Sequence, residues 1–231
     1  MKPEIPTFIE NLFIGLVVAI FTIFINRIIN YFPKKSIALL SVLISWLGFL
    51  VFYSSTDLVH DYSLIPPPFL LVIVPPLLFI IWFASYLSKR ISLQMIPLFL
   101  PVIIQSFRIL IEVILFALYQ NGIIPILMTF EGLNYDILVG ITAIPAGFLI
   151  AKQKMSAKTT IIWNIFGILL LVNIVVIAIL SSPLPIRMFM NEPTNTIVFW
   201  FPFILLPGFV VPFALLMHVV SIRQNLNYGK A

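Results

Sequence analysis

The sequence predicts an all-α protein built as a polytopic membrane bundle of seven transmembrane helices. Of its 231 residues, 61% are hydrophobic and only 9% are charged, whereas a soluble domain carries about 25% charged residues. Seven long apolar runs alternate with short loops, and a spanning helix needs about 20 such residues. The runs lack the alternation typical of membrane β-barrels. We expect one domain, residues 1–231.

The first three apolar runs predict helices over 8–31, 36–55 and 66–88. The first run is not a cleaved signal peptide, because such peptides place positive charge before the apolar segment and here most of it follows. The second run starts directly after Lys34 and Lys35. The third starts at a cluster of prolines and stops before a Lys-Arg pair.

The next four runs predict helices over 93–119, 134–151, 159–181 and 195–222. The run 93–119 is the longest and carries charged residues inside it. The run 134–151 is the shortest. The run 159–181 holds two asparagines, and 195–222 is punctuated by prolines.

Prolines fall inside four of the predicted spans. Each removes a backbone donor and leaves the carbonyl four residues earlier without its partner, and in lipid such groups need neighbouring side chains, water or local unwinding. We therefore expect several proline-broken helices, with simple kinking as the alternative; broken helices often flank transporter binding sites. The prolines are Pro75, Pro76, Pro97, Pro101, Pro145, Pro202, Pro207 and Pro212.

The basic residues predict the orientation, because cytoplasmic loops carry an excess of Lys and Arg. Of the 13 such residues, Lys2 and Arg187 fall on one side and Arg108 lies within a span. The N-terminus is therefore predicted outside and the C-terminus in the cytoplasm. The residues assigned to the cytoplasmic side are Arg27, Lys34, Lys35, Lys89, Arg90, Lys152, Lys154, Lys158, Arg223 and Lys230.

Several function classes are excluded or disfavoured. The absence of cysteine excludes disulfides and thiolate metal sites. The net charge of +5 is spread over short loops, which favours anionic lipid headgroups over nucleic acid as the partner. His60 near Asp57 and Asp61 is too weak a pattern for a metal site, and His218 is expected at the membrane interface. We predict no metal and no cofactor.

The sharpest candidate site is Arg108 with Glu112 inside the span 93–119. At this spacing the two side chains share one face of a helix, and Gln105 falls on the same stripe. A charge at the bilayer centre costs at least about 2.5–3.5 kcal/mol, so intramembrane ions indicate function by default. We expect Arg108 to pair with Glu112 or to face a water-filled cavity; a purely structural salt bridge is the alternative.

Polar residues on the outer side complete the predicted site. Glu131, Asn134 and Asp136 follow the apolar loop 123–130, which we expect in the interface or as a re-entrant segment. Helix capping by Asn134 is the alternative explanation. Asn173 is expected near the level of Arg108, although hydrogen bonding between helices explains such asparagines equally well.

Four strings carry a family resemblance: Phe107-Arg108-x-x-x-Glu112, Met128-Thr-Phe-Glu-Gly-x-Asn-x-Asp-Ile137, Trp163-Asn164-x-x-Gly167 and Phe201-Pro-Phe-x-x-Leu-Pro207. Together they resemble a family of small, uncharacterised bacterial seven-helix integral membrane proteins. The resemblance covers about residues 100–225. It implies a multi-pass protein of the bacterial inner (plasma) membrane and brings no known activity.

These observations predict a protein that binds or translocates a small polar or anionic ligand through an outward-biased cavity. Arg108 would bind the ligand, Glu112 would hold Arg108 or exchange a proton, and Glu131, Asn134 and Asp136 would form the outer mouth. One alternative is a membrane-embedded enzyme that acts on a lipid-linked substrate, with Glu112 or Asp136 as acid or base. Another is an accessory subunit of a membrane complex. Beyond the lipid bilayer, the partner is a polar or lipid-linked ligand, a second copy or a membrane complex, and not nucleic acid.

Overall fold

The computed structural model describes residues 3–90 and 96–227, and the elements in these ranges are helices, turns and loops without a strand. The 3₁₀ turn Ile104–Ser106 joins two of the helices into one segment, and the π-helix Leu206–Val210 leads directly into the last. The α-helices are α1 (Thr7–Tyr31), α2 (Ser36–Tyr53), α3 (Leu70–Arg90), α4 (Leu100–Ile103), α5 (Phe107–Gln120), α6 (Ile137–Ala151), α7 (Ala157–Leu180) and α8 (Val211–Asn227).

Five helical segments in the described part of the chain are long and apolar enough to cross a membrane. They are Thr7–Tyr31, Pro33–Tyr53, Leu100–Gln120, Ala157–Leu180 and Leu206–Leu226. Two shorter apolar segments, Leu70–Ser85 and Ile137–Ala151, lie at the third and fifth predicted spans. The prediction of an all-α membrane protein is thus confirmed at this level. The start of the predicted span 93–119, Lys2 and Lys230 lie outside the described residues.

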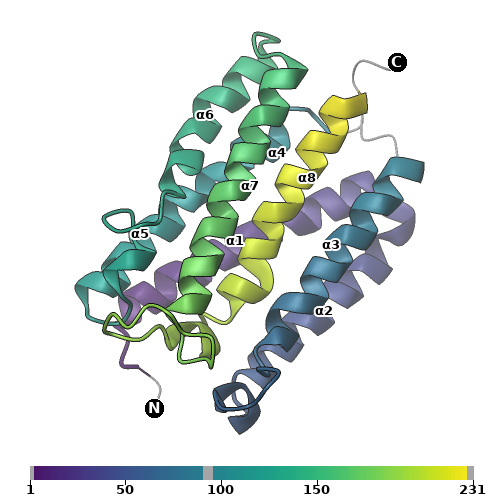
Figure 1. Ribbon diagram of the computed structural model, residues 1–231. Coiled ribbons are helices and arrows are strands. Elements are labelled where there is room, and N and C mark those ends of the chain that lie inside the picture. The colour runs from purple at the N-terminus through teal and green to yellow at the C-terminus, as the bar shows by residue number, and fades with distance from the viewer. Residues whose placement is uncertain (1–2, 91–95, 228–231) are drawn as a thin grey trace.

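With α4 and α5 taken as one segment, successive helices run in opposite directions, and the start of α1 and the end of α8 lie at opposite ends of the bundle (Figure 1). Apolar side chains face outward along them: Ile37 is 81% exposed and Phe52 68%. Polar side chains are buried between them, among them Arg108, Asn134 and His218. A soluble protein distributes its side chains the other way round, so the arrangement fits a lipid surround.

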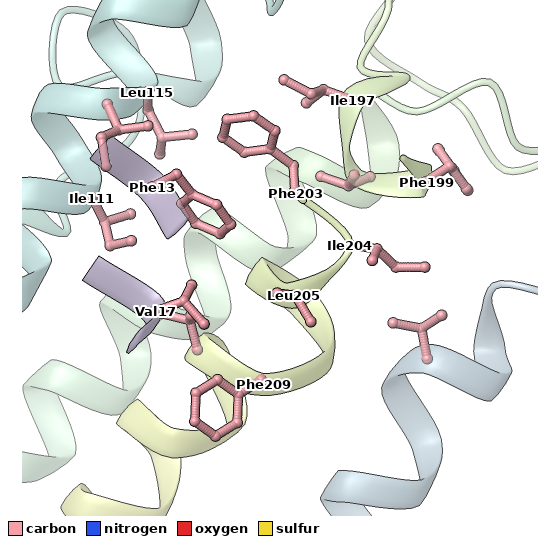
Figure 2. Packing of buried hydrophobic residues seen from close by; sticks show 14 of the residues in the cluster. Phe13, Val17, Ile111, Leu115, Ile197, Phe199, Phe203, Ile204, Leu205 and Phe209 are labelled. Atoms are coloured by element: carbon pink, nitrogen blue, oxygen red, sulfur yellow. The ribbon is translucent and has the colours of Figure 1, made fainter. Parts of the chain in front are cut away.

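The C-terminal span begins later than the pattern predicts. Residues 195–205 form a 3₁₀ turn and an irregular segment, and the helical part runs from Leu206 to Asn227. Pro202 and Pro207 explain the delay, because proline removes a donor and disfavours helical geometry in the residue before it. The displaced segment fills the core, and Phe203 stacks on Phe13 of α1 with ring centroids 4.5 Å apart (Figure 2).

Three other internal prolines leave their helices unbroken. α3 continues through Pro75 and Pro76, and α6 continues through Pro145. Where Pro212 cannot donate to the carbonyl of Gly208, the indole Nε1 of Trp46 on α2 donates to it at 2.8 Å. A neighbouring helix therefore supplies the hydrogen bond that the proline removes, as a dry environment requires.

The loop between α5 and α6 packs into the protein rather than lying at its surface. Ile124 and Thr129 are fully buried, and Met128 is 1% exposed. The apolar segment 123–130 is therefore part of the core, and it carries the polar residues that follow it back toward α5.

Two glycines let α6 approach the α4–α5 segment closely. A Cβ atom on Gly140 would lie 2.8 Å from the backbone nitrogen of Ile109, and one on Gly147 would lie 2.8 Å from Cβ of Ile103. By contrast, a Cβ on Gly15 would meet no atom within 4 Å. The close approach of α6 thus depends on the absence of side chains at Gly140 and Gly147.

We predict that Gly140→Ala destabilises the protein by about 1–3 kcal/mol, the usual cost of overpacking a core. Gly15→Ala on α1 is the matched control, and it should be neutral or stabilising by up to about 1 kcal/mol, because alanine is the better helix former. Unfolding of the purified variants in detergent measures both. Equal stability of the two variants would contradict the tight α5–α6 contact.

Candidate functional site

Arg108 is buried at the centre of the bundle, with 1% of its surface exposed. Its guanidinium makes a two-pronged ion pair with Asp136, in which Nε donates to Oδ2 at 2.6 Å and Nη2 donates to Oδ1. Such fork-to-fork pairs are the strong form of a charge-assisted hydrogen bond. The pair joins the start of α5 to the start of α6, 28 residues further along the chain.

Glu112 lies one turn beyond Arg108 on α5 and is also 1% exposed. Its carboxylate oxygens accept hydrogen bonds from Nδ2 of Asn134, at 2.7 and 2.8 Å. No ion pair or hydrogen bond joins Arg108 to Glu112 within the described residues, so the expected intrahelical pair is wrong. Asp136 approaches the guanidinium with both carboxylate oxygens. Glu112, on the same helix as Arg108, does not.

The backbone between α5 and α6 is held so that Asn134 and Asp136 face inward together. Oδ1 of Asn134 accepts from the backbone nitrogen of Asp136 at 3.0 Å, while Asn134 Nδ2 also donates to the carbonyl of Met128. α6 begins at the next residue, Ile137. Asp136 therefore sits at the positive end of the helix dipole, which favours its carboxylate. Asn134 is not the cap of α6, because the N-cap position is Asp136 and no side-chain capping hydrogen bond is found there.

The cluster continues through His218 on α8, which is fully buried. Its Nε2 lies 3.0 Å from Nη1 of Arg108, and its Nδ1 lies 2.9 Å from Oδ1 of Asn164. Arginine has no acceptor, so Nε2 of His218 accepts a hydrogen bond from Arg108. Nδ1 of His218 then carries the ring proton and donates a hydrogen bond to Oδ1 of Asn164. Asn164 in turn donates to Oγ of Ser221, at 2.9 Å. Polar contacts thus run from Asp136 through Arg108, His218 and Asn164 to Ser221.

The interfacial position expected for His218 is wrong, and the shift of the last helix explains it. The span was placed at 195–222, which puts residue 218 near its end, whereas α8 runs to Asn227. A signal was present in Trp163-Asn164-x-x-Gly167. Asn164 bonds to His218, and a Cβ on Gly167 would lie 2.4 Å from the ring carbon Cε1 of His218.

The remaining predicted site residues lie apart from this chain of contacts. Gln105 is fully buried and donates to the carbonyl of Ala214 on α8 at 2.9 Å. Asn173 donates to the carbonyl of Leu133 at 2.8 Å and so braces the α5–α6 loop. Glu131 is exposed on that loop. Asn164, for which helix-to-helix bonding was expected, does join α7 to α8.

A small cavity of about 70 Å³ reaches the cluster from the end of the bundle where the α5–α6 and α7–α8 loops lie. Its walls are mostly apolar and come from α3, α5, α7 and the π-helix, with Ser182 toward one end. Glu112 and Asp136 are the charged residues in its lining, and Arg108 is not part of it. The cavity therefore presents carboxylates rather than the guanidinium.

The loops after α2 and α7 contain short-range hydrogen bonds to exposed carboxylates. A hydrogen bond from Arg187 holds the pKa of Glu192 below its usual value, and hydrogen bonds from Ser63 do the same for the pKa of Asp61. His60 stacks on Trp200 with ring centroids 3.8 Å apart. These residues form contacts among the loops and do not reach the buried cluster.

The fold and the cluster define an apolar protein, helical in its described ranges, whose helices are suited to a membrane and whose bundle encloses Arg108, Glu112 and Asp136. Residues 67–226, more than half of the chain, match the model of a family described as a domain of unknown function (DUF8737), and the protein belongs to that family. All the residues of the cluster fall within the matched range. Comparisons with curated proteins and with solved structures find no match.

We predict that Arg108→Gln and Asp136→Asn each destabilise the protein by about 3–5 kcal/mol, because each leaves the opposite charge buried and unpaired. The double variant should lose less than the sum of the two, since the partners act as a unit. Glu131→Gln on the exposed loop is the control and should change the free energy of unfolding by less than about 0.5 kcal/mol. Additive losses in detergent unfolding would contradict the pairing.

Proposed function

We propose that this protein resides in the bacterial inner membrane, with its N-terminus outside, and translocates a small solute that is cationic or rich in hydrogen-bond donors. In this proposal the carboxylate of Glu112 binds the solute or takes up a proton. The balance of charge in the buried cluster carries the proposal.

The cluster holds one more carboxylate than it has cations to match. Arg108 makes its ion pair with Asp136, while the hydrogen-bond partner of Glu112 is the neutral amide of Asn134. His218 is neutral in its present contacts, because its Nε2 accepts from Arg108. An ionised carboxylate in an apolar interior costs several kcal/mol unless it is paired. A proton or a solute cation next to Glu112 removes that cost.

The cavity supplies a route to this carboxylate. Glu112 and Asp136 line it, and its volume of about 70 Å³ suits a few waters or a small group. An anionic ligand, as predicted for Arg108, would have to displace Asp136 from the guanidinium and pass the carboxylates. The geometry therefore favours a positively charged or hydrogen-bond-donating solute over an anion.

The contacts beyond Arg108 support coupling to a proton. His218, Asn164 and Ser221 continue the chain of hydrogen bonds toward the C-terminal end of α8. If His218 took up a proton at Nε2, that nitrogen would become a donor and face the donors of Arg108. Protonation of His218 thus requires Arg108 to move, which also changes its pairing with Asp136. Chains of Asp, Glu and His in membranes often serve as proton relays.

The orientation can be tested directly because the chain has no cysteine. We expect Glu131→Cys, on the exposed α5–α6 loop, to react with a membrane-impermeant maleimide in intact spheroplasts. Lys154→Cys, on the loop between α6 and α7, should react only after permeabilisation, because its side carries the excess of Lys and Arg. The reverse pattern would overturn the proposed sidedness.

The solute site is tested by cation-dependent stability. We expect at least one of sodium, potassium, ammonium, methylammonium and guanidinium to raise the thermal stability of the wild type at fixed ionic strength, since a ligand that binds only the folded state stabilises it. Glu112→Gln should abolish this increase, and Glu131→Gln should retain it. Proteoliposomes should then take up the stabilising cation, with flux lost in Glu112→Gln. A response unchanged in Glu112→Gln would overturn the proposal.

A further inference from the structure

A second and larger cavity lies on the other side of the π-helix, between α1, α2, α3, α4 and α8. Its volume is about 270 Å³, close to the lower end of the range for ligand pockets, about 300–1,000 Å³. Its walls are almost entirely apolar, and they include Trp46, Phe79 and Phe213. No carboxylate is found among the described residues that line it. We call this space the apolar crevice.

Among the described residues, one cation lines the apolar crevice, near the end of α1. Arg27 lies 20 residues after Thr7, about 30 Å along the helix at 1.5 Å per residue, and the hydrocarbon core of a bilayer is about 30 Å thick. If α1 spans that core, Arg27 is at the level of the lipid headgroups. Tyr31, one turn further on, lines the same end, and Lys34 and Lys35 follow in the next turn.

The guanidinium of Arg27 is not fully used by the protein. Its Nε is buried and has no hydrogen-bond partner among the described residues. A buried donor without a partner costs free energy, and a phosphate oxygen is a suitable acceptor for the guanidinium fork. The crevice thus offers an apolar channel with an anion-binding group at the membrane surface.

We propose that the apolar crevice binds one hydrocarbon chain of an anionic phospholipid whose phosphate contacts Arg27. The apolar walls accommodate the chain, and the charge of Arg27 selects an anionic headgroup over a zwitterionic one. The lack of carboxylates in the lining separates this site from the cavity at Glu112. The lipid site is therefore independent of the proposed translocation and can stand if that proposal fails.

The test uses the full-length protein in nanodiscs made of equal amounts of phosphatidylglycerol and phosphatidylcholine. After transfer to mild detergent, native mass spectrometry counts the lipids retained by each chain. We expect one retained lipid, with phosphatidylglycerol preferred. Arg27→Gln should keep a lipid but lower the preference for phosphatidylglycerol about fivefold, the effect of one basic residue near a membrane surface. Lys34→Gln, at the same surface but outside the crevice lining, is the control and should keep the preference.

A second pair of variants tests the chain-binding part. Val42 lines the crevice yet is 60% exposed, so Val42→Trp should fill the space without disturbing the core. We expect it to abolish lipid retention. Ile44→Trp, at a site 57% exposed on the same helix but outside the lining, should retain the lipid. Wild-type protein without retained lipid, a dimer in place of the lipid-bound chain, or equal retention in the Val42 and Ile44 variants would each overturn the proposal.

Discussion

An arginine inside an apolar bundle must have its charge matched, and the ion pair of Arg108 with Asp136 meets that requirement in this protein. The requirement is strong because breaking a buried pair costs about 3–5 kcal/mol. It also has a structural consequence. Arg108 is on α5 and Asp136 begins α6, so the intervening loop must return into the bundle to bring the two together.

The rest of the architecture supports this return. Buried residues of the loop, such as Ile124 and Met128, anchor it in the core, and Asn173 of α7 holds its backbone at Leu133. Gly140 then lets α6 pack against the backbone of α5 near Arg108. The shortness of α6 follows from the same arrangement, because its first turn starts at the buried ion pair rather than at the surface.

Sequence patterns predicted the helices well and their partners less well. Length and hydropathy located α1, α2 and α7 to within a few residues, because apolar content fixes where a helix can meet lipid. The pattern also singled out Arg108 and Glu112 inside a span, since charged residues are costly in apolar surroundings. It assigned Asn134 and Asp136 to the outer mouth, whereas both are buried. Spacing along one helix could not reveal which carboxylate Arg108 meets, because the choice depends on how the loop folds back.

His218 shows a second limit of the sequence. Its burial depends on where the last helical segment begins, and this segment starts at Leu206 with the π-helix that leads into α8. An error in one predicted helix boundary therefore led to a core residue being predicted at the membrane interface. Asn164 was predicted to bond to a neighbouring helix. Which residue it bonds to depends on how α7 packs against α8.

The π-helix Leu206–Val210 lies between the cavity at Glu112 and the apolar crevice. Leu206 and Pro207 line the cavity at Glu112, whereas Gly208 and Phe209 line the apolar crevice. π-Helical turns within longer helices occur frequently at functional sites. Any displacement of this segment changes both spaces at once, because its side chains form the wall between them. Trp46 bonds to the carbonyl of Gly208, so α2, which borders the crevice, is tied directly to that wall. A lipid chain held against α2 would therefore lie beside a helix that is hydrogen-bonded to this wall.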